Sequence, residues 1–408
     1  MNLIDALPID WKIVLLKEIC KIIVSNVDKH IFENEIPVKI CNYTDVYYNN
    51  FIFSELKLSD GTVKSEELQK YSLRKGDVII TKDSEDRKDI AVPALVLEEM
   101  ENVVCGYHLA ILRPFSKKID SGYLSQMINY APINHQFQKL ANGMTRFGLN
   151  ICSIENAKIP IPDLNEQQKI SEILMGCDLK ITIINNLVNE LKIRNKNISK
   201  NLISGRKRIQ GFNNEWKFIP LENCLKNEIR LVEKPKEPFL SIGIRSHGKG
   251  IFHKPNFNPA DIAMEELYEV KEDDLIVNIT FAWEQAIAIV SKEDDGGLVS
   301  HRFPTYIFKK EKAIPEFFRH FILQPRFKYL LELISPGGAG RNRVMSKKDF
   351  LKLEVKIPSV EEQKAIAEVL DTANLELKLY EEKLRLLQEQ KKGLLQQLLT
   401  GKTRVILR

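Results

Sequence analysis

Residues 162–205 begin with PDLNEQQKISEIL and run into LISGRKR at their end, and residues 358–401 repeat this arrangement with PSVEEQKAIAEVL and LLTGKTR. Each residue of the second segment lies 196 positions after its counterpart in the first, so the two segments align without a gap. The identical pairs are Glu166/Glu362, Gln167/Gln363, Ile170/Ile366, Leu174/Leu370, Leu191/Leu387, Leu202/Leu398 and Arg208/Arg404. An internal repeat of this length indicates that one structural element occurs twice in the chain.

Both segments carry the signals that begin and end a helix. Asp163 and Ser359 suit the cap, and a Glu follows each of them three residues later, which is the capping-box pattern in which the Glu side chain bonds back to the cap. Gly205 and Gly401 stand where a helix needs a left-handed residue to stop. We therefore predict one long helix per segment, each of about 41 residues and roughly 60 Å in length.

Apolar residues recur in both segments at steps of four and three, which is typical of a coiled-coil seam. The predicted seam residues are Ile170, Leu174, Ile181, Ile184, Leu191 and Leu202 in the first helix, and Ile366, Leu370, Leu377, Tyr380, Leu387 and Leu398 in the second. One polar residue interrupts each seam, Asn195 and Lys391. Since helices this long exceed the usual globular range, we expect the two seams to pack on each other.

The blocks that precede the long helices also resemble each other. Asp10-Trp11-Lys12 opens one block and Glu215-Trp216-Lys217 the other, and a charged turn enters a β-rich run at Asp77 and again at Asp274. Each block then predicts further strands, one amphipathic helix (around 122–140 and 315–334) and a glycine-rich basic loop. The predicted fold class is α+β, with two mixed α/β domains (1–160 and 209–356), two long helices (161–208 and 357–408) that form an antiparallel coiled coil, and an internal pseudo-two-fold repeat.

Composition limits the class of protein without deciding it. With 408 residues, 44% hydrophobic and 28% charged, the chain can form more than one core, and a net charge of +5 permits a nucleic-acid partner without requiring one. Six cysteines without a C-x-x-C pair indicate reduced thiols. No signal-peptide pattern and no apolar run of membrane-spanning length are present, so we expect a cytoplasmic protein without a membrane partner.

Two apparent catalytic or cofactor-binding motifs lack a residue or a geometry that their chemistry requires. Gly401-Lys402-Thr403 resembles the end of a phosphate-binding loop, but Gln396 stands where that loop needs glycine, and a helix precedes it. Asp163 with Glu190-Leu-Lys192 formally matches a nuclease metal pattern, yet both ends would lie about 40 Å apart on one helix. We predict no catalytic, cofactor-binding or metal-binding residue in this chain.

Residues suited to DNA contact gather in the predicted loops of both blocks. Basic side chains neutralise phosphates, and Arg, Asn or Gln can bond to base edges. An exposed arginine is more often only a solvated surface residue, but glycines beside Arg146 and Arg341 allow close approach to a ligand. The candidate DNA-binding residues are Tyr43, Thr44, Lys82, Arg87, Lys88, Asn142, Arg146, Arg245, His247, Lys249, Arg341, Asn342 and Arg343.

The two W-K openings, the two variable blocks and the doubled P-x-[LV]-x-E-Q … G-[RK] frame resemble the specificity subunit of type I DNA restriction–modification enzymes. The resemblance covers nearly the whole chain. It implies that each block is a target-recognition domain for one half of a split double-stranded DNA sequence, and that the long helices act as spacer and platform. It also implies two methyltransferase subunits and two motor–nuclease restriction subunits as partners, with S-adenosylmethionine, ATP and Mg²⁺ bound by them and not by this chain.

Two other classes of protein compete with this interpretation. A structural coiled-coil adaptor without sequence-specific DNA recognition would account for the long helices, but not for two matched domains with basic loops. A self-contained nuclease would need a catalytic cluster, and its only candidate fails on distance.

Overall fold

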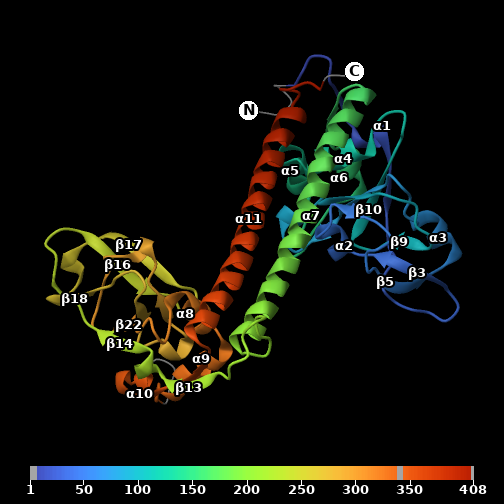
Figure 1. Cartoon of the computed structure of the whole chain (residues 1–408). Helices are drawn as coiled ribbons and strands as arrows, with labels where there is room; N and C mark the ends of the chain where they lie inside the picture. The colour runs from blue at the N-terminus through green and yellow to red at the C-terminus, as the bar shows by residue number, and fades with distance from the viewer. Residues whose placement is uncertain (1–6, 338–342, 406–408) are drawn as a thin grey trace. The chain divides into compact units, whose positions relative to one another are not determined.

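The computed structural model describes residues 7–337 and 343–405, which form two compact units (Figure 1). Unit 1 contains residues 1–186 and 381–408, and unit 2 contains residues 187–380. Helix α7 (Leu164–Ile203) begins in unit 1 and ends in unit 2, whereas α11 (Val360–Leu398) begins in unit 2 and ends in unit 1. Each unit therefore holds one mixed domain, the start of the long helix that follows this domain, and the end of the other long helix.

Unit 1 is built on a five-stranded sheet of order β2-β10-β6-β8-β4 and a three-stranded sheet of order β5-β3-β9. Alternate residues of β6 face opposite sides: Val78 and Ile80 join the core beneath the helices, and Ile79 joins the core shared with the three-stranded sheet. The elements of its domain are β1 (Lys12–Leu15), α1 (Leu16–Ile19), β2 (Cys20–Val24), β3 (Ile36–Cys41), α2 (Tyr43–Tyr47), β4 (Phe51–Ile52), β5 (Ser59–Val63), α3 (Ser65–Tyr71), β6 (Val78–Thr81), β7 (Asp83–Ser84), η2 (Arg87–Asp89), β8 (Pro93–Val96), β9 (Val103–Cys105), β10 (Leu109–Pro114), α4 (Ser121–Asn129), α5 (Ala131–Leu140), β11 (Phe147–Gly148), α6 (Ile151–Glu155) and β12 (Lys158–Ile161).

Unit 2 is built on a four-stranded sheet of order β14-β22-β19-β20 and a five-stranded sheet of order β15-β18-β21-β16-β17. Every pairing in these two sheets is antiparallel except that of β16 with β21. The elements of its domain are β13 (Lys217–Pro220), η3 (Leu221–Asn223), β14 (Leu225–Glu228), β15 (Leu231–Glu233), β16 (Phe239–Ile244), β17 (Ile251–Phe257), η4 (Pro259–Asp261), β18 (Glu266–Glu269), β19 (Leu275–Val277), η5 (Ala282–Glu284), β20 (Ile287–Ile289), η6 (Lys292–Asp294), β21 (Leu298–Val299), β22 (Thr305–Phe308), α8 (Pro315–Phe321), α9 (Pro325–Leu333), α10 (Lys347–Lys352) and β23 (Glu354–Ile357).

The repeat extends from the long helices into the domains. The order β2-β10-β6-β8 in unit 1 matches β14-β22-β19-β20 in unit 2, and the two-stranded pair β1-β12 matches β13-β23. The second sheet of each domain, however, differs in strand number and order. The α+β fold class with its long helices and internal repeat is thus confirmed, and the divergence between the domains is concentrated in the second sheet.

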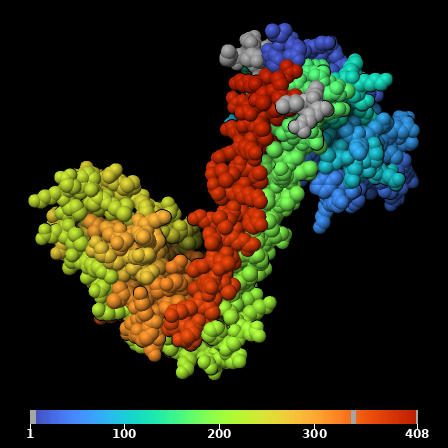
Figure 2. Space-filling view, turned by 45° about the horizontal axis from the view of Figure 1, so that its top comes forward, coloured from blue at the N-terminus to red at the C-terminus, as the bar shows by residue number. Residues whose placement is uncertain are grey.

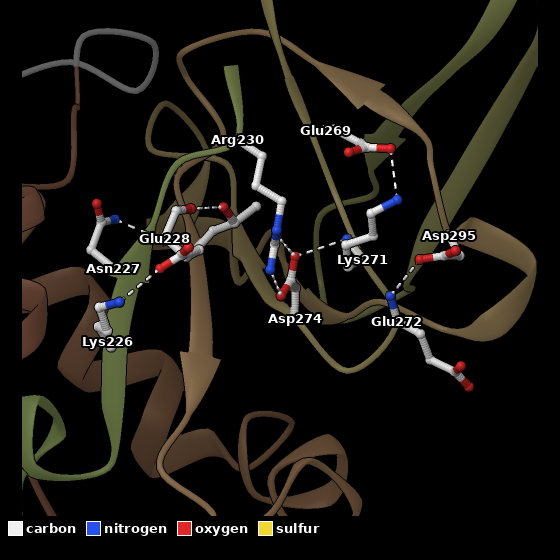
Figure 3. Close-up of polar contacts among 10 residues, drawn as sticks. Lys226, Asn227, Glu228, Arg230, Glu269, Lys271, Glu272, Asp274 and Asp295 are labelled. Atoms are coloured by element: carbon white, nitrogen blue, oxygen red, sulfur yellow. Dashed lines mark hydrogen bonds and ion pairs between the residues drawn. The ribbon is translucent and has the colours of Figure 1, made fainter. Parts of the chain in front are cut away.

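A buried aspartate marks the same turn in both domains, just before the central strand. Asp274 accepts hydrogen bonds from both terminal nitrogens of Arg230 (2.5 and 3.2 Å) and from the backbone N–H of Lys271 (2.8 Å; Figure 3). Asp77 is held in the same way by the side chain of Arg113 (2.8 and 2.7 Å) and the backbone N–H of Arg74. A buried carboxylate needs such partners, and each domain supplies the arginine from a different strand region.

The backbone at the ends of the long helices agrees with the prediction, but the glutamate side chain at each start has a different partner. Asp163 accepts from the backbone N–H of Glu166 (3.1 Å), and Gly205 and Gly401 adopt φ values of 70° and 65°. The prediction that Glu166 bonds back to the cap is wrong. Its carboxylate instead accepts two hydrogen bonds from Arg404 (2.6 and 2.7 Å). A bidentate, charge-assisted pair is stronger than a bond to one backbone N–H.

The same exchange occurs in unit 2, where Glu362 accepts from Arg208 (2.6 and 2.7 Å) and from the indole N–H of Trp216 (3.1 Å). In each unit the glutamate that starts one long helix therefore binds the arginine that follows the end of the other. The neighbouring glutamine joins the helix start to its own domain: Gln167 accepts from the Asp120 N–H, and Gln363 accepts from the Ile314 N–H.

The predicted seam residues of the long helices differ in burial. In unit 1, Leu398 joins Ile170 and Leu174 in one hydrophobic cluster, and Figure 2 shows the end of α11 (red) against α7 (green). In unit 2, Leu202 joins Ile366 and Leu370 in another. Of the remaining predicted residues, Leu191 is buried, while Ile181, Ile184, Leu377, Tyr380 and Leu387 are half-buried.

The prediction of a single amphipathic helix in each domain is wrong, because each of the two predicted ranges forms two separate helices. Residues 121–140 form α4 and α5, which break at Tyr130, and residues 315–333 form α8 and α9, which break before Pro325. Pro132 and Pro325 lie in the first turn of the second helix of each pair. Proline lacks the N–H that a continuing helix requires, and its ring disfavours a helical residue before it.

In the described ranges, no helix is long and apolar enough to span a bilayer.

Candidate nucleic-acid interface

A short ribbon in unit 1 brings together loops that are far apart in the sequence. Strand β11 pairs antiparallel with β7, so that Phe147 lies opposite Ser84 and Gly148 opposite Asp83. The residues of the ribbon stand beside the candidate DNA-binding residues of both loops, which are Lys82, Arg87 and Lys88 in one and Asn142 and Arg146 in the other. The fold thereby brings these candidate residues into one neighbourhood.

A chain of polar contacts runs across this ribbon. Lys82 Nζ lies 2.5 Å from Asp83 Oδ2, and the same carboxylate oxygen lies 3.2 Å from Nδ1 of His108. A terminal nitrogen of Arg146 lies 2.9 Å from Nε2 of the imidazole and 3.5 Å from its Nδ1. Since a carboxylate only accepts, Nδ1 of His108 donates to Asp83. His108 thus orients Arg146, whose side chain is exposed.

Tyr43 and Thr44 reach the same neighbourhood from helix α2. The Tyr43 hydroxyl lies 3.1 Å from Ser84 Oγ, and its ring stacks on Tyr47 with centroids 5.5 Å apart. Burial raises the pKa of Tyr43, so its hydroxyl remains a donor at neutral pH. Thr44 is exposed beside it. This edge of the candidate interface offers hydroxyl groups, a type of side chain that can bond to phosphates or to bases.

The basic loops are supported by backbone pairing and by one aromatic ring. The guanidinium of Arg87 lies 4.7 Å from the centroid of Phe147, which keeps the charge over the ribbon, and Lys88 is exposed next to it. Asn142 exchanges two backbone hydrogen bonds with Gly148 (3.0 and 2.9 Å), closing the loop that carries Arg146. Gly143 has a φ of 135°, a conformation that other residues rarely adopt.

In unit 2 the candidate residues lie on the hairpin loop between β16 and β17. Arg245, His247 and Lys249 are exposed on this loop. The loop is tied to η5 by hydrogen bonds from the His247 N–H to the Glu284 carbonyl (2.6 Å) and from the Gly248 N–H to the Gln285 carbonyl (3.1 Å). These bonds fix the backbone of the loop that carries the basic side chains.

Arg343 approaches the same element from the C-terminal side of the domain. Its guanidinium lies 5.3 Å from the ring of Trp283, a residue of η5. The other two candidates of this loop, Arg341 and Asn342, lie outside the described residues. Helix η5 thus connects Arg343 with the loop of Arg245, as the β7–β11 ribbon connects Arg146 with the loop of Arg87.

The residues that organise both candidate interfaces were not singled out in the sequence. They are Asp83, Ser84 and His108 in unit 1, and Trp283 and Glu284 in unit 2. Nothing in the sequence near these residues indicated a role, because each acquires its partner only when a distant segment folds beside it.

Across residues 7–337 and 343–405, no group of three or more His, Cys, Asp or Glu side chains is arranged to hold a metal ion.

Comparison with known proteins relates both halves of the chain to one family. The family model described as the type I restriction modification DNA specificity domain matches residues 8–193 and again 221–389. The MjaX specificity subunit of Methanocaldococcus jannaschii is 24% identical over 98% of this chain and 96% of its own length, and the MjaVIII specificity subunit of the same organism is 24% identical over 71% and 69%. A solved S subunit of a type I restriction–modification system from M. genitalium matches 98% of this chain and 97% of its own with a TM-score of 0.59 at 14% identity, a likeness of fold.

Proposed function

The chain belongs to the type I restriction modification DNA specificity family, and we propose that it selects the split double-stranded DNA target of a multisubunit restriction–modification enzyme. Each domain would read one half of the target. The observation that carries this proposal is the recurrence of an exposed basic group in each unit, supported by β7–β11 in one and by η5 in the other. An adaptor without DNA recognition would need neither group.

The chemistry of the two groups fits contact with a duplex. Arg, Lys and hydroxyl side chains position a protein on phosphates, whereas Arg and Asn can bond in pairs to guanine or adenine in the major groove. The two groups contain different residues in different geometries. We therefore expect the two half-sites to differ in sequence.

The chain is proposed to recruit its catalytic partners and to perform no bond chemistry itself. Large apolar side chains are exposed at equivalent positions of the two long helices, where Leu179 and Leu375 are 45% and 57% exposed and Ile183 and Leu379 are 64% and 62% exposed. A surface that occurs twice suits two copies of one partner. We assign this surface to two methyltransferase subunits; two restriction subunits, and the S-adenosylmethionine, ATP and Mg²⁺ of the reaction, belong to the larger assembly.

Methylation mapping tests the proposal directly. A host genome sequenced with and without the gene for this chain should show a methylated, split motif only when the chain is present. Binding of the complex to a duplex with this motif should weaken steeply with rising salt, because phosphate contacts release counterions. Methylation that does not depend on the chain, or binding that ignores the motif, would favour the adaptor.

A further inference from the structure

Unit 2 contains an aromatic cavity of about 430 Å³ beside the hairpin β16–β17. Its walls include Phe239, Phe252, Phe257, Phe281 and Phe303 together with Lys254. Cavities of this size that combine aromatic walls with a few polar groups are typical ligand sites. None of the residues that line it is among the candidate DNA-binding residues.

The strand geometry of β17 builds one wall of the cavity. Alternation along a strand puts Phe252 and Lys254 on one face and His253 on the other, where His253 lies 2.6 Å from Asp294. Strict alternation would then send Phe257 to the face of His253. Between the pairs Ser241/Lys254 and Phe239/Phe257, however, β17 contains one residue more than β16. This bulge, with Asn256 at a φ of 53°, returns Phe257 to the face of Lys254.

A glycine makes room for the next ring. Gly243 lies directly opposite Phe252 in the antiparallel pair, and a Cβ atom at this position would stand 2.5 Å from the Phe252 ring. Any larger residue would therefore push the ring away from the sheet. The bulge and the glycine together hold two phenylalanine rings at the cavity instead of in the core.

These rings are left partly uncovered. Phe239, Phe252 and Phe257 belong to none of the buried hydrophobic clusters of the described chain, and Phe281 is 39% exposed. Two cations stand at the rings. Lys254 Nζ lies 5.7 Å from the centroid of Phe252 and 5.6 Å from that of Phe257, and the Arg245 guanidinium lies 5.1 Å from Phe252. The site thus combines flat apolar walls with a positively charged rim.

We propose that this cavity binds a nucleobase, stacked against the phenylalanine rings, with the attached phosphate at Lys254 and Arg245. Aromatic rings bind bases through their faces, and a basic rim suits the phosphate that every nucleotide carries. The base can come from two sources: a base turned out of the bound duplex, or a free nucleotide. The first source rests on the proposed DNA recognition, whereas the second does not.

Two binding measurements on the full chain distinguish the sources. The first uses duplexes of the mapped target with 2-aminopurine at each position, in turn, of the half-site assigned to unit 2. A base that leaves the stack should raise the fluorescence severalfold at one position. Removing its pairing partner should strengthen binding at least about tenfold, because unpairing no longer opposes it. The second measurement titrates AMP against the chain without DNA.

The variants are Phe257→Leu, which removes a ring and keeps an apolar side chain, and Lys254→Gln, which removes the rim charge at an exposed position. Phe218→Leu is the matched control, since Phe218 is 55% exposed on β13 and does not line the cavity. The proposal expects both cavity variants to reduce the fluorescence change or the AMP affinity at least fivefold, with thermal unfolding unchanged in Lys254→Gln. The control should keep both signals.

The outcomes separate this proposal from the proposed function. Sequence-specific DNA binding with no 2-aminopurine response, together with no saturable AMP binding, overturns the nucleobase site and leaves DNA recognition in place. A signal that survives both cavity variants also overturns it. AMP binding that both variants weaken, in a chain that ignores the motif, supports the site while contradicting the proposed function.

Discussion

Lys391 Nζ lies 2.5 Å from Asp178 Oδ1 in unit 1, with the two side chains only 11% and 2% exposed. The other carboxylate oxygen of Asp178 accepts from Gln126 (2.6 Å), so the buried charge is fully partnered. In unit 2 the position equivalent to Lys391 is Asn195, which donates to the backbone carbonyl of Ala373 (2.7 Å). One position of the repeat thus holds a buried ion pair in one copy and a neutral amide in the other.

Breaking this pair should destabilise unit 1. Asp178→Asn leaves the Lys391 charge buried without a counter-charge, which typically costs about 3–5 kcal/mol. Replacing both residues with Asn should recover a large part of this loss, because no charge then remains buried. Urea denaturation combined with hydrogen exchange of residues 164–186 measures the effect. Arg385→Gln, at an exposed pair on α11, serves as the control and should leave the stability unchanged. Equal losses in the single and double variants would contradict this account.

Arg146 should contribute to base recognition in one half-site. If the side chain held by His108 reaches a base, Arg146→Ala should relax one position of the motif and reduce discrimination there by about 1–3 kcal/mol. His108→Ala should have a weaker effect at the same position, because it removes only the support. Methylation mapping of both variants gives the result, with Arg385→Ala as a charge-matched control. A uniform loss of affinity with a smaller salt dependence would assign Arg146 to a phosphate.

The repeated apolar surface of the long helices should bind two methyltransferase subunits. Leu179→Glu should remove one subunit, Leu375→Glu the other, and the double variant both, because a charge placed in an apolar interface must be desolvated. Native mass spectrometry of the assembled complex counts the subunits. Lys180→Glu changes the charge more but removes little apolar surface, and it should keep both subunits. Full assembly of the double variant would place the interface elsewhere.

The length of the long helices should set the spacing between the half-sites. Four helix-forming residues inserted after Asn186 and four more after Tyr380 lengthen both helices by roughly 6 Å, nearly one full turn. The mapped motif should then gain one or two base pairs between its halves, at about 3.4 Å per base pair. Two-residue insertions at the same places rotate the following seam by about 200° and should abolish methylation. An active four-residue variant with an unchanged spacer would show that the helices do not measure the DNA.

The stability of unit 2 should decrease as the pH is lowered from neutral. Burial lowers the pKa of His320, an effect larger than the opposing one of its hydrogen bond to Asp371 (2.8 Å). The unfolded chain therefore takes up this proton more readily than the folded chain, so the stability is complete above the ordinary histidine pKa of about 6.5 and is lost as the pH falls below it. Melting temperatures at pH 7.5 and 5.5 should differ more for the native chain than for His320→Gln. An equal decrease in both would exclude His320 as the cause.

The sequence by itself determined the features that depend on local signals. The ungapped repeat, the caps at Asp163 and Ser359 and the left-handed Gly205 and Gly401 could be read directly, because helix periodicity and helix ends are set by neighbouring residues. The strands that follow Asp77 and Asp274 were equally accessible. The breaks at Tyr130 and before Pro325 had the proline as a signal, which the apolar periodicity outweighed in the prediction.

Only the tertiary structure decided which partner each polar side chain takes. Glu166 could bond to its own cap or to an arginine 238 positions later, and only the packed helices bring Arg404 within reach. His108 supports Arg146 because β7 and β11 pair, and Gly243 matters because β17 places Phe252 opposite it. Such contacts join segments that are distant in the chain, and their strength depends on burial and geometry that no local pattern encodes.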